Sequence, residues 1–577
     1  MQNVHRCHIL VSLLVIGSAI DLCAQAPTFS WARTIGSTGN DVIKALDTDA
    51  NGNIYALGDF SGTVDFDPGP GVFEMTAVNA SSFVLKLDPN GDFLWARAFS
   101  ASVNSFSAND ISVDPAGHAW IIGTFAGTMD IDPGTPVVNI TSDGGTDVFF
   151  VRLDPNGTRM RYGRGGGPND DTGNSIVADD QGNAYMTGRV WQGAVFESAP
   201  HSTSDVVSGF NAPDVFVLKL PPTGDFEWYD NLGGFFWDEG NAITLDAQGN
   251  VLVAGTLSGP SDFGQGNPNI LPGDGTKDIF VCKLSNSGVI TWVRSVVPGQ
   301  EDIAYDIATD ALGDVYTTGT FYSIVDFDPG PGVNALDTQG PRLSFIQKLD
   351  AAGDFVWAGM LNSTNNNSSW GVHIDAEGEV WCTGTFQATT DFDLGPGTAN
   401  LISNGGGQDG FLQHLDANGN YLWAGAVSGS GIDQGLAVTT SVSGALLLGG
   451  FFQDTADLDP GTGVSNATSA GTRDGFLVEL DADINTEVHA VGSDAPLRLW
   501  PNPSQGTFHI DLHGITSTAP FQVSLVDALG KRVPAPTRAL FTSGFVTVVL
   551  DEEVAPGVYA VQILAGTDQW VERLVVE

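Results

Sequence analysis

Residues 82–95 read SFVLKLDPNGDFLW: an apolar run, an Asp-x-x-Gly segment, and a second apolar run that ends in Trp95. Asp accepts a hydrogen bond from the backbone two residues on, and Gly adopts the positive φ that closes a hairpin with a bulge. The stretch therefore predicts two antiparallel strands joined by a tight turn.

A second hairpin of the same form precedes this one, with strands predicted at 42–48 and 53–59 around the turn Asp49–Gly52. Its Asp-x-x-Gly turn recurs at Asp114/Gly117, Asp179/Gly182, Asp246/Gly249, Asp310/Gly313 and Asp375/Gly378, and becomes Ser441/Gly444 in the last copy. The turn of residues 88–91 recurs at Asp154/Gly157, Asp350/Gly353 and Asp416/Gly419, while Gly224 and Gly288 are kept without the Asp. Each unit thus carries four strands, which is the composition of one β-propeller blade.

The copy number follows from aromatic residues at a constant spacing. These residues are Trp31, Trp95, Tyr162, Trp228, Trp292, Trp357 and Trp423, in steps of 64, 67, 66, 64, 65 and 66 residues. A fixed period of this length is the sequence signature of a repeat architecture. The chain is predicted to be all-β, with a seven-bladed β-propeller over residues 27–482.

The two ends of the repeat region predict that the ring closes. Residues 29–33 form a strand without a preceding partner, and residues 475–480 form one without a following partner. Pairing them completes the last blade and removes an exposed sheet edge.

The composition narrows the classes of function. The chain has 577 residues and a net charge of -46. A field of that sign repels phosphate backbones and anionic lipids, so nucleic-acid binding is disfavoured. It favours cations, and it also suits solubility outside the cell.

The N-terminus resembles a secretory signal peptide over residues 1–24, with Arg6 before an apolar run at 9–20 and small residues near Ala24. No other segment is long and apolar enough to span a membrane. Cys282 and Cys382 lie in strand-like runs of different repeats and are expected to be buried hydrophobic residues.

The period stops near Asp483, and residues 483–496 form a polar linker. Residues 497–577 contain short strand signals separated by Pro and Gly, which predicts a small Ig-like β-sandwich of roughly seven strands.

Two resemblances follow from these residues. The stretch 241–256 and the run 83–91 resemble the SBBP-type bacterial β-propeller repeat, which implies the fold but no single activity. The C-terminal segment is similar to the type A sorting domain of the type IX secretion system, through Pro501-Asn502-Pro503, residues 527–531 and Pro556-Gly557-Val558-Tyr559. That resemblance implies the secretion machinery as a partner, and a location outside the cell or on the outer-membrane surface.

One acidic pattern lies eight residues before each first turn, at the start of the presumed innermost strand. The acidic members are Asp41, Asp171, Asp238, Asp302 and Asp433, and Phe106 and Asn367 take the place in the other two repeats. Symmetry would set these side chains around one mouth of a central channel, where the carboxylates could hold a cation. The alternative is that each Asp caps its own loop.

A second acidic pattern, Asp-x-Asp, follows the second strand of five repeats. Its members are Asp65, Asp67, Asp130, Asp132, Asp326, Asp328, Asp391, Asp393, Asp457 and Asp459. Residues two apart in an extended segment point to the same side, so each pair could offer two carboxylates to Ca²⁺. Ca²⁺ needs about six to eight oxygens, so solvated loop carboxylates are the alternative.

Three classes of function are compatible with these features. The first is a secreted or surface-displayed propeller that binds an extracellular ligand or partner, with Ca²⁺ as a candidate cofactor. The second is a structural surface or adhesion component. The third, a polysaccharide-acting enzyme, is disfavoured because acids that follow the repeat do not make one asymmetric catalytic pair. Within the first class, the irregular segment 191–210 of the third repeat is a candidate ligand contact.

Overall fold

The computed structural model describes residues 26–481 except 80, 104, 200–203, 207–211, 264–269, 272, 274, 297–299 and 406. Beyond residue 481 it describes the strands of a second unit. The chain divides into two compact units, Met1–Ala482 and Asp483–Glu577. The predicted signal peptide (1–24) and linker (483–496) lie outside the described residues.

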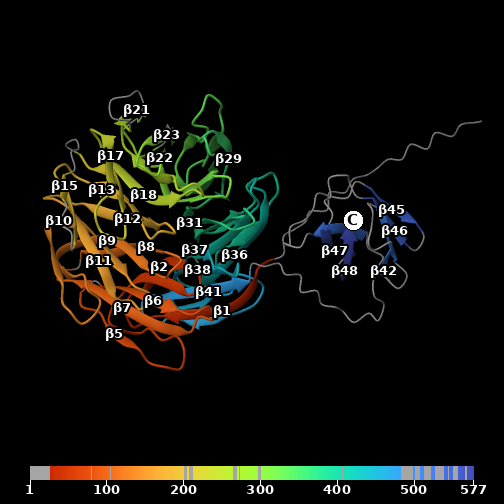
Figure 1. Cartoon of the computed structure of the whole chain (residues 1–577), viewed down its shortest axis with the longest axis horizontal. Coiled ribbons are helices and arrows are strands. Elements are labelled where there is room, and N and C mark those ends of the chain that lie inside the picture. The colour runs from red at the N-terminus through yellow and green to blue at the C-terminus, as the bar shows by residue number, and fades with distance from the viewer. Residues whose placement is uncertain are drawn as a thin grey trace, which may run out of the picture. The chain divides into compact units, whose positions relative to one another are not determined.

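The first unit consists of antiparallel sheets arranged around a centre, some of them joined by additional strands into larger sheets (Figure 1). Within these sheets, the strand pairings of the described residues repeat a four-stranded group. We call these groups blades 1 to 7 and list each from the inner to the outer strand. Blades 1 to 3 are β2 (Val42–Thr48), β3 (Ile54–Phe60), β6 (Ser81–Leu87) and β7 (Phe93–Ala101); β8 (Phe106–Val113), β9 (Ala119–Asp130), β10 (Asn139–Leu153) and β11 (Arg159–Gly166); and β12 (Thr172–Ala178), β13 (Ala184–Val190), β16 (Asp214–Leu220) and β17 (Trp228–Gly234). Blades 4 to 6 are β18 (Asp238–Leu245), β19 (Val251–Leu257), β22 (Asp278–Leu284) and β23 (Ile290–Val296); β24 (Ile303–Thr309), β25 (Val315–Phe321), β28 (Leu343–Leu349) and β29 (Phe355–Met360); and β31 (Ser368–Ile374), β32 (Val380–Phe386), β35 (Asp409–Leu415) and β36 (Tyr421–Gly429). Blade 7 is β37 (Gln434–Thr440), β38 (Leu446–Phe452), β41 (Asp474–Asp481) and β1 (Thr28–Ile35).

Blade 7 closes the ring with strands from both ends of the unit. β1 pairs antiparallel with β41, with Trp31 opposite Glu479 and Ile35 opposite Gly475. Each inner strand lies beside the inner strand of the next blade, and β37 lies beside β2. The predicted pairing of the first and last repeat strands is therefore confirmed.

Every inner strand contains one β-bulge in its pairing with the second strand. The bulged residues, in blade order, are Lys44, Asn109, Asn174, Asn241, Tyr305, Trp370 and Leu436. A bulge inserts an unpaired residue, bends the strand and re-aims the side chain. These seven positions bring different chemistry to one layer at the centre of the ring.

Small hairpins that the sequence did not predict interrupt the connection between the second and third strands. They are β4 (Thr63–Asp65) with β5 (Glu74–Thr76), β20 (Ser261–Asp262) with β21 (Ile270–Leu271), β26 (Ile324–Asp326) with β27 (Ala335–Asp337), β33 (Thr389–Asp391) with β34 (Asn400–Ile402), and β39 (Thr455–Asp457) with β40 (Asn466–Thr468). The two-residue β30 (Asn362–Ser363) pairs with β33. Strands of two or three residues are too short to show a period in the sequence.

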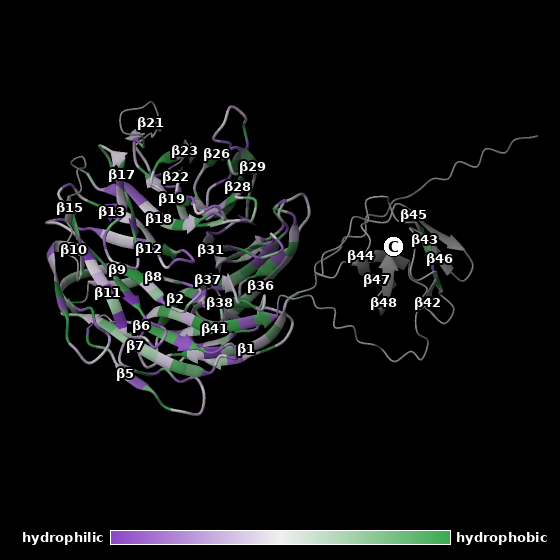
Figure 2. Ribbon diagram, in the orientation of Figure 1, coloured by the Kyte–Doolittle hydropathy of each residue, from purple (hydrophilic) through white to green (hydrophobic). Residues whose placement is uncertain are grey.

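The core lies between neighbouring blades. The second and third strands are buried along nearly their whole length, as in β6 and β25. Figure 2 shows the hydrophobic residues running mainly along the strands. Tyr55 and Trp95 of blade 1 share one cluster with Phe125 and Phe149 of blade 2. Each blade thus uses its two faces against its two neighbours, which explains the continuous apolar runs in the sequence.

The periodic Trp residues lie on the outer strands and contact the following blade. The indole of Trp292 on β23 donates from Nε1 to the carbonyl oxygen of Ala351 at 3.2 Å. The Cβ of any other residue at Gly353, in the same turn of blade 5, would lie 2.9 Å from that indole. The Arg294 Nε donates to the Gly353 carbonyl at 2.8 Å. Equivalent contacts join Trp31 to Gly91, Trp95 to Gly157, Trp228 to Gly288 and Trp357 to Gly419.

The C-terminal unit contains two antiparallel sheets in its described strands. The first has the order β42 (Arg498–Trp500), β43 (Thr507–Asp511), β46 (Phe545–Val549) and β45 (Arg538–Thr542). The second has the order β44 (Phe521–Val526), β47 (Gly557–Ala565) and β48 (Asp568–Val576). Phe508, Ile510 and Val548 of the first sheet and Val561 of the second are fully buried, which agrees with the predicted small sandwich.

The contact between Trp292 and Gly353 predicts unequal costs for two glycine substitutions in blade 5. Gly353 has φ 79° and Gly313 has φ 84°. Alanine at either position would adopt a left-handed backbone conformation, which destabilises the folded state by about 1–2 kcal/mol. At Gly313 the nearest atom to an added Cβ is 3.6 Å away, whereas at Gly353 it is the indole at 2.9 Å. We expect Gly353→Ala to lower the free energy of unfolding clearly more than Gly313→Ala in equilibrium denaturation. Equal losses would show that the indole contact does not constrain the turn.

Candidate functional site

The ring of acidic residues at the inner-strand entries is fully buried in the structure. Asp41, Asp171, Asp238, Asp302 and Asp433 are each inaccessible to solvent. Asp171 is typical: its carboxylate accepts hydrogen bonds from the backbone N–H of Gly167 at 2.8 Å and of Trp191 at 2.6 Å. Asp238 does the same with Gly234 and Ser258. These carboxylates cap loops of their own blade, and none of the five lines the central cavity.

The other two members of this position also have local roles. Phe106 is buried and stacks on Phe149, with ring centroids 5.4 Å apart. The Asn367 amide accepts from the Ser344 backbone N–H at 2.6 Å and donates to the Leu361 carbonyl at 3.2 Å.

Four of the Asp-x-Asp pairs lie at the ends of small hairpins, and Asp130 and Asp132 lie at the corresponding end of the long strand β9. In each of the five, Oδ1 of the first Asp accepts backbone N–H groups two and eight residues ahead. Oδ1 of the second Asp accepts from the Gly two residues on. The apolar residue between them is buried, as Phe66 and Phe327 illustrate. Each described tip therefore supplies two carboxylates with Oδ1 of each engaged, and Arg159 also holds Oδ2 of Asp132. This is fewer ligands than a Ca²⁺ site requires.

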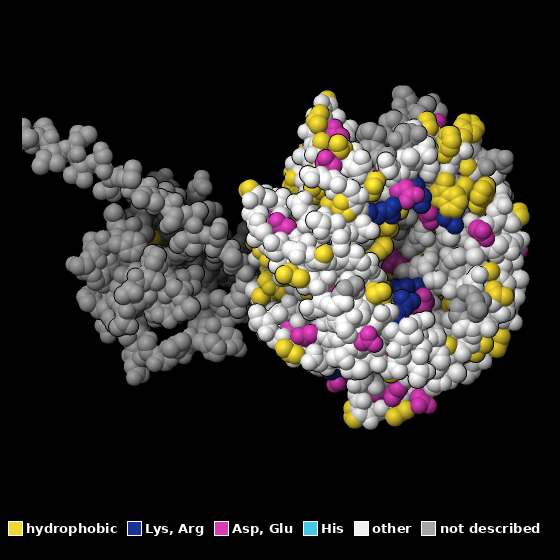
Figure 3. All heavy atoms as spheres, turned by 180° about the vertical axis from the view of Figure 1, so that it is seen from behind, with side chains coloured by type: hydrophobic (Ala, Val, Ile, Leu, Met, Phe, Trp, Pro, Cys, Tyr) yellow, Lys and Arg dark blue, Asp and Glu magenta, His cyan; other side chains and the backbone are white. Residues whose placement is uncertain are grey.

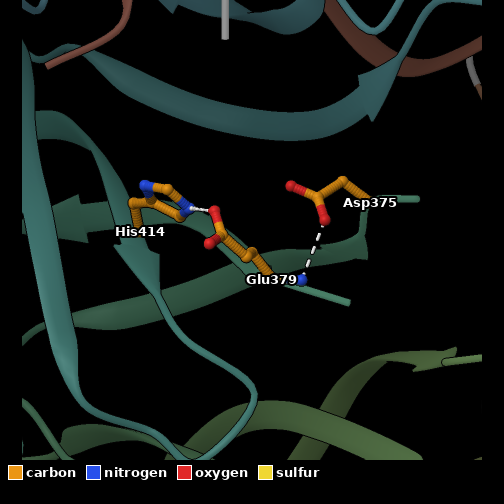
Figure 4. Close-up of side chains that lie close together, drawn as sticks. All are labelled: Asp375, Glu379 and His414. Carbon is orange, nitrogen blue, oxygen red and sulfur yellow. Dashed lines mark hydrogen bonds and ion pairs between the residues drawn. The ribbon is translucent and has the colours of Figure 1, made fainter. Parts of the chain in front are cut away.

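One group of three metal-ligand types does come together in the described residues: Asp375, Glu379 and His414 of blade 6 (Figure 4). The His414 Nε2 lies 2.7 Å from Glu379 Oε2, and the imidazole stacks on Trp381 at 3.7 Å between centroids. Asp375 accepts from the Glu379 backbone and from the Trp381 Nε1. This set could hold a metal ion only by exchanging those contacts.

The same place in other blades explains the cluster. There a Lys or Arg of the third strand pairs with the Asp of the first turn. The pairs are Lys86–Asp49 at 3.2 Å, Arg152–Asp114 at 2.8 Å, Lys283–Asp246 at 2.9 Å and Lys348–Asp310 at 3.5 Å. His414 replaces the cation of this repeated ion pair, so the cluster follows the architecture of the blade.

The central cavity lies among the inner strands, and the residues that line it differ from blade to blade. It has a volume of about 260 Å³ and is lined by all seven bulged residues, which come from all seven inner strands. Asn109, Asn174 and Asn241 donate from Nδ2 to backbone carbonyls of the next inner strand, at 2.7–2.9 Å. Across the ring, Tyr305 and Trp370 lie against each other, with centroids 4.4 Å apart and planes 39° apart. The cavity therefore has an amide side and an aromatic side.

The charged side chains in and around the cavity already have partners, either an opposite charge or hydrogen-bond donors. The Lys44 Nζ lies 2.9 Å from Asp59 Oδ2 and 2.6 Å from the Ser107 hydroxyl. Asp110 Oδ2 accepts from the Ser175 hydroxyl and the Ile176 backbone, and Asp306 Oδ2 accepts from the Val372 backbone. Burial raises the pKa of Asp110 to about 6 and that of Asp306 to about 7.

A group of aromatic residues lies at the entry to the inner strand of blade 4. Phe235, Phe236 and Trp237 are 74%, 48% and 37% exposed. The guanidinium of Arg189 lies 4.2 Å from the Trp237 ring centroid. Glu239 accepts from the Trp237 Nε1 at 3.3 Å, from Arg189 at 3.2 Å and from the cavity residue Asn174 at 3.0 Å. We call Phe235, Phe236, Trp237, Arg189 and Glu239 the aromatic rim; Figure 3 shows a face with a central hollow beside hydrophobic, basic and acidic side chains.

Neither the bulged residues nor the rim was predicted from the sequence. Each bulged residue lies three positions after the acidic-ring position of its repeat, but nothing in the sequence marks a bulge. The rim was visible as three consecutive aromatic residues directly before Asp238.

The irregular segment of the third repeat adds two short strands to the sheet of the neighbouring blade. β14 (Val195–Ala199) pairs with the outer strand β11 of blade 2, and β15 (Ser204–Val206) pairs with β14. Residues 200–203 and 207–211 lie outside the described residues. A pocket of about 290 Å³ lies here, lined in part by Tyr162, Arg164 and Glu197. Its role as a ligand contact stays a prediction.

Comparisons with known proteins agree with this architecture. Residues 163–189 match the family model described as beta-propeller repeat, and residues 498–577 match the secretion system C-terminal sorting domain. The chain carries β-propeller repeats and a C-terminal sorting domain. This tail implies export of the repeat protein to the cell surface or beyond it. In the described residues, no helix is long and apolar enough to cross a membrane.

Curated relatives are distant. An uncharacterised WD repeat-containing protein of Acanthamoeba polyphaga mimivirus is 24% identical over 504 residues, covering 73% of this chain and 36% of that protein. The regulatory protein FlaEY of Caulobacter vibrioides is 29% identical over 161 residues, covering 28% of this chain and 16% of that protein. The chain thus aligns with about a third or less of either relative. A crystal structure of the N-terminal eight Ig domains of the Down syndrome cell adhesion molecule covers 94% of this chain and 100% of its own, with 9% identity and a TM-score of 0.10, which is too low to indicate a shared fold.

The buried carboxylates predict how the stability of this repeat protein depends on pH. Burial raises the pKa of Asp171, Asp238, Asp306 and Asp433 to about 7, whereas an unfolded Asp titrates near about 3.9. The folded state then binds more protons between these values, so stability is lost as the pH rises toward 7. The opposite contribution, from lowered pKa values such as that of Asp246, is lost only at more acidic pH.

We therefore expect a higher melting temperature at pH 5 than at pH 8. Asp306→Asn should reduce that difference, while Asn at the exposed Asp180 should leave it unchanged. A melting temperature that rises from pH 5 to pH 8 would contradict the assignment.

Proposed function

We propose that the exported propeller is a binding module whose ligand occupies the central cavity and the aromatic rim. The observation that carries this proposal is the asymmetry of the bulged layer. The same backbone position holds Lys, Asn, Asn, Asn, Tyr, Trp and Leu in successive blades. A ring assembled only for stability has no need of five different residue types at equivalent positions of its centre.

Two further features support a ligand site. Pockets with a few convergent polar groups and apolar walls are the usual form of small-ligand sites. The Phe235–Trp237 group is a contiguous exposed apolar feature beside charged groups, which marks interaction surfaces. The proposal is a binding role without catalysis, since the carboxylates Asp110 and Asp306 are engaged with neighbouring backbone. A structural surface or adhesion role is the alternative.

The proposal predicts that ligands stabilise the full chain through the cavity. In a thermal-shift screen across sugars, amino acids, nucleosides and short peptides, at least one class should raise the melting temperature of the wild type. The same compounds should have less effect on Trp370→Leu, while the exposed Leu312→Ala, away from the cavity, should respond like the wild type. If no class binds, or if Trp370→Leu responds fully, the cavity is not the site and the structural role is preferred.

Calcium binding at the Asp-x-Asp tips remains a separate prediction. If Ca²⁺ binds there, added Ca²⁺ should raise the melting temperature and EDTA should lower it, because a ligand of the folded state shifts its stability. Asp326→Asn combined with Asp328→Asn should reduce the effect, and the exposed Asp180→Asn should not. A melting temperature insensitive to both Ca²⁺ and EDTA would contradict the prediction.

A further inference from the structure

We infer that the ligand of the central cavity and the aromatic rim is the end of a neutral carbohydrate chain. This inference rests on the binding role proposed above and adds the chemical class of the ligand. It follows from three properties of the site: aromatic faces, oriented amides, and charged groups that already have partners within the protein.

Aromatic rings are present at two levels of the site. Tyr305 and Trp370 lie on one wall of the cavity, and Phe235, Phe236 and Trp237 lie exposed at the rim. A sugar ring presents faces of C–H groups that pack on aromatic faces, while its hydroxyls remain at the edge. Aromatic groups at such positions supply contact area with little loss of side-chain entropy.

The opposite wall supplies oriented hydrogen-bonding groups. The amides of Asn174 and Asn241 are held by their Nδ2 donors, which bond to carbonyls of the next blade. The hydrogen bonds of both amides among the described residues are made by Nδ2, which leaves Oδ1 as an acceptor, and an oxygen of this kind accepts two hydrogen bonds. Hydroxyl groups are donors that suit these acceptors. An apolar peptide side chain would leave them unpaired.

The charges indicate a neutral ligand. Lys44 pairs with Asp59, and Arg189 pairs with Glu239. The other charged groups of the wall, Asp110 and Asp306, accept hydrogen bonds on both oxygens from Ser175 and from backbone N–H groups. A charged ligand buried here would have to displace one of these pairs or hydrogen bonds, which costs free energy. The net charge of -46 also repels anionic chains such as uronates and sulfated glycans.

The dimensions indicate a chain end. A volume of about 260 Å³ lies just below the range of about 300–1,000 Å³ for small-molecule sites, so the cavity takes a small group. Asn174 on its wall bonds to Glu239, which in turn bonds to Trp237 at the rim. Hydrogen bonds thus link the cavity wall to the rim, an arrangement that suits one sugar inside the cavity and further units against the rim.

The test uses the full secreted chain with soluble neutral polysaccharides as probes: a β-glucan, a xylan and a mannan. Affinity electrophoresis measures retardation, and calorimetry with the matching tetrasaccharides measures affinity. Trp237→Ala and Trp370→Leu should each weaken binding about ten-fold, which corresponds to about 1.4 kcal/mol. Leu312→Ala is the matched control, since it removes an exposed apolar side chain away from the site, and circular dichroism verifies the fold of each variant.

Retardation by at least one neutral polysaccharide, weakened by both variants, supports the inference. Binding of a protein or peptide at the rim with no response to any polysaccharide overturns it and leaves the binding role intact. Stronger binding of a charged glycan than of neutral ones also overturns it. The absence of every ligand class contradicts both this inference and the proposed function.

Discussion

The contact between one blade's outer-strand tryptophan and the next blade's turn glycine sets the geometry of the propeller. The indole of Trp292 fills the space that a Cβ at Gly353 would need, and its Nε1 is tied to the turn carbonyl of Ala351. The same contact occurs at five of the seven interfaces between blades, and at each it holds the outer strand of one blade against a turn of the next. Blade 7 has no such turn, because its third and fourth strands come from opposite ends of the unit. There β1 carries Trp31 to Gly91, so closing the last sheet also supplies the contact to blade 1.

The residues that join neighbouring blades are similar from repeat to repeat, whereas the residues at the centre of the ring vary. The turn, the tryptophan and the apolar second and third strands form the contacts between blades, and they recur in most repeats. The bulged residue of each inner strand faces the centre of the ring, where no neighbouring blade dictates its size. Asn109, Asn174 and Asn241 still bond across to the next blade, whereas Tyr305, Trp370 and Leu436 do not share that chemistry.

The sequence predicted the features that depend on local and periodic rules. Hairpin turns, the four strands of each unit and the pairing of β1 with β41 follow from turn chemistry, spacing and unpaired strands. The bulges could not be predicted, because a bulge depends on the register between two strands and any residue type can occupy it. The hairpin β4–β5 was missed because its strands have three residues each. The grouping of Asn174, Glu239 and Trp237 depends on the contact of two blades about 65 residues apart in the chain.

The buried acidic residues illustrate why residues that recur in the repeat are poor candidates for a ligand site. The buried Asp recurs in five of the seven blades, and Asp171 and Asp238 show its role, since each fixes two backbone N–H groups of loops. A ligand that is not itself seven-fold symmetric needs different groups at equivalent positions. In this propeller that condition is met at the bulged layer, and again at the rim, where one blade alone carries Phe235, Phe236 and Trp237 before its buried Asp. The two asymmetric features are joined through Asn174 and Glu239, which is why they are assigned to a single site.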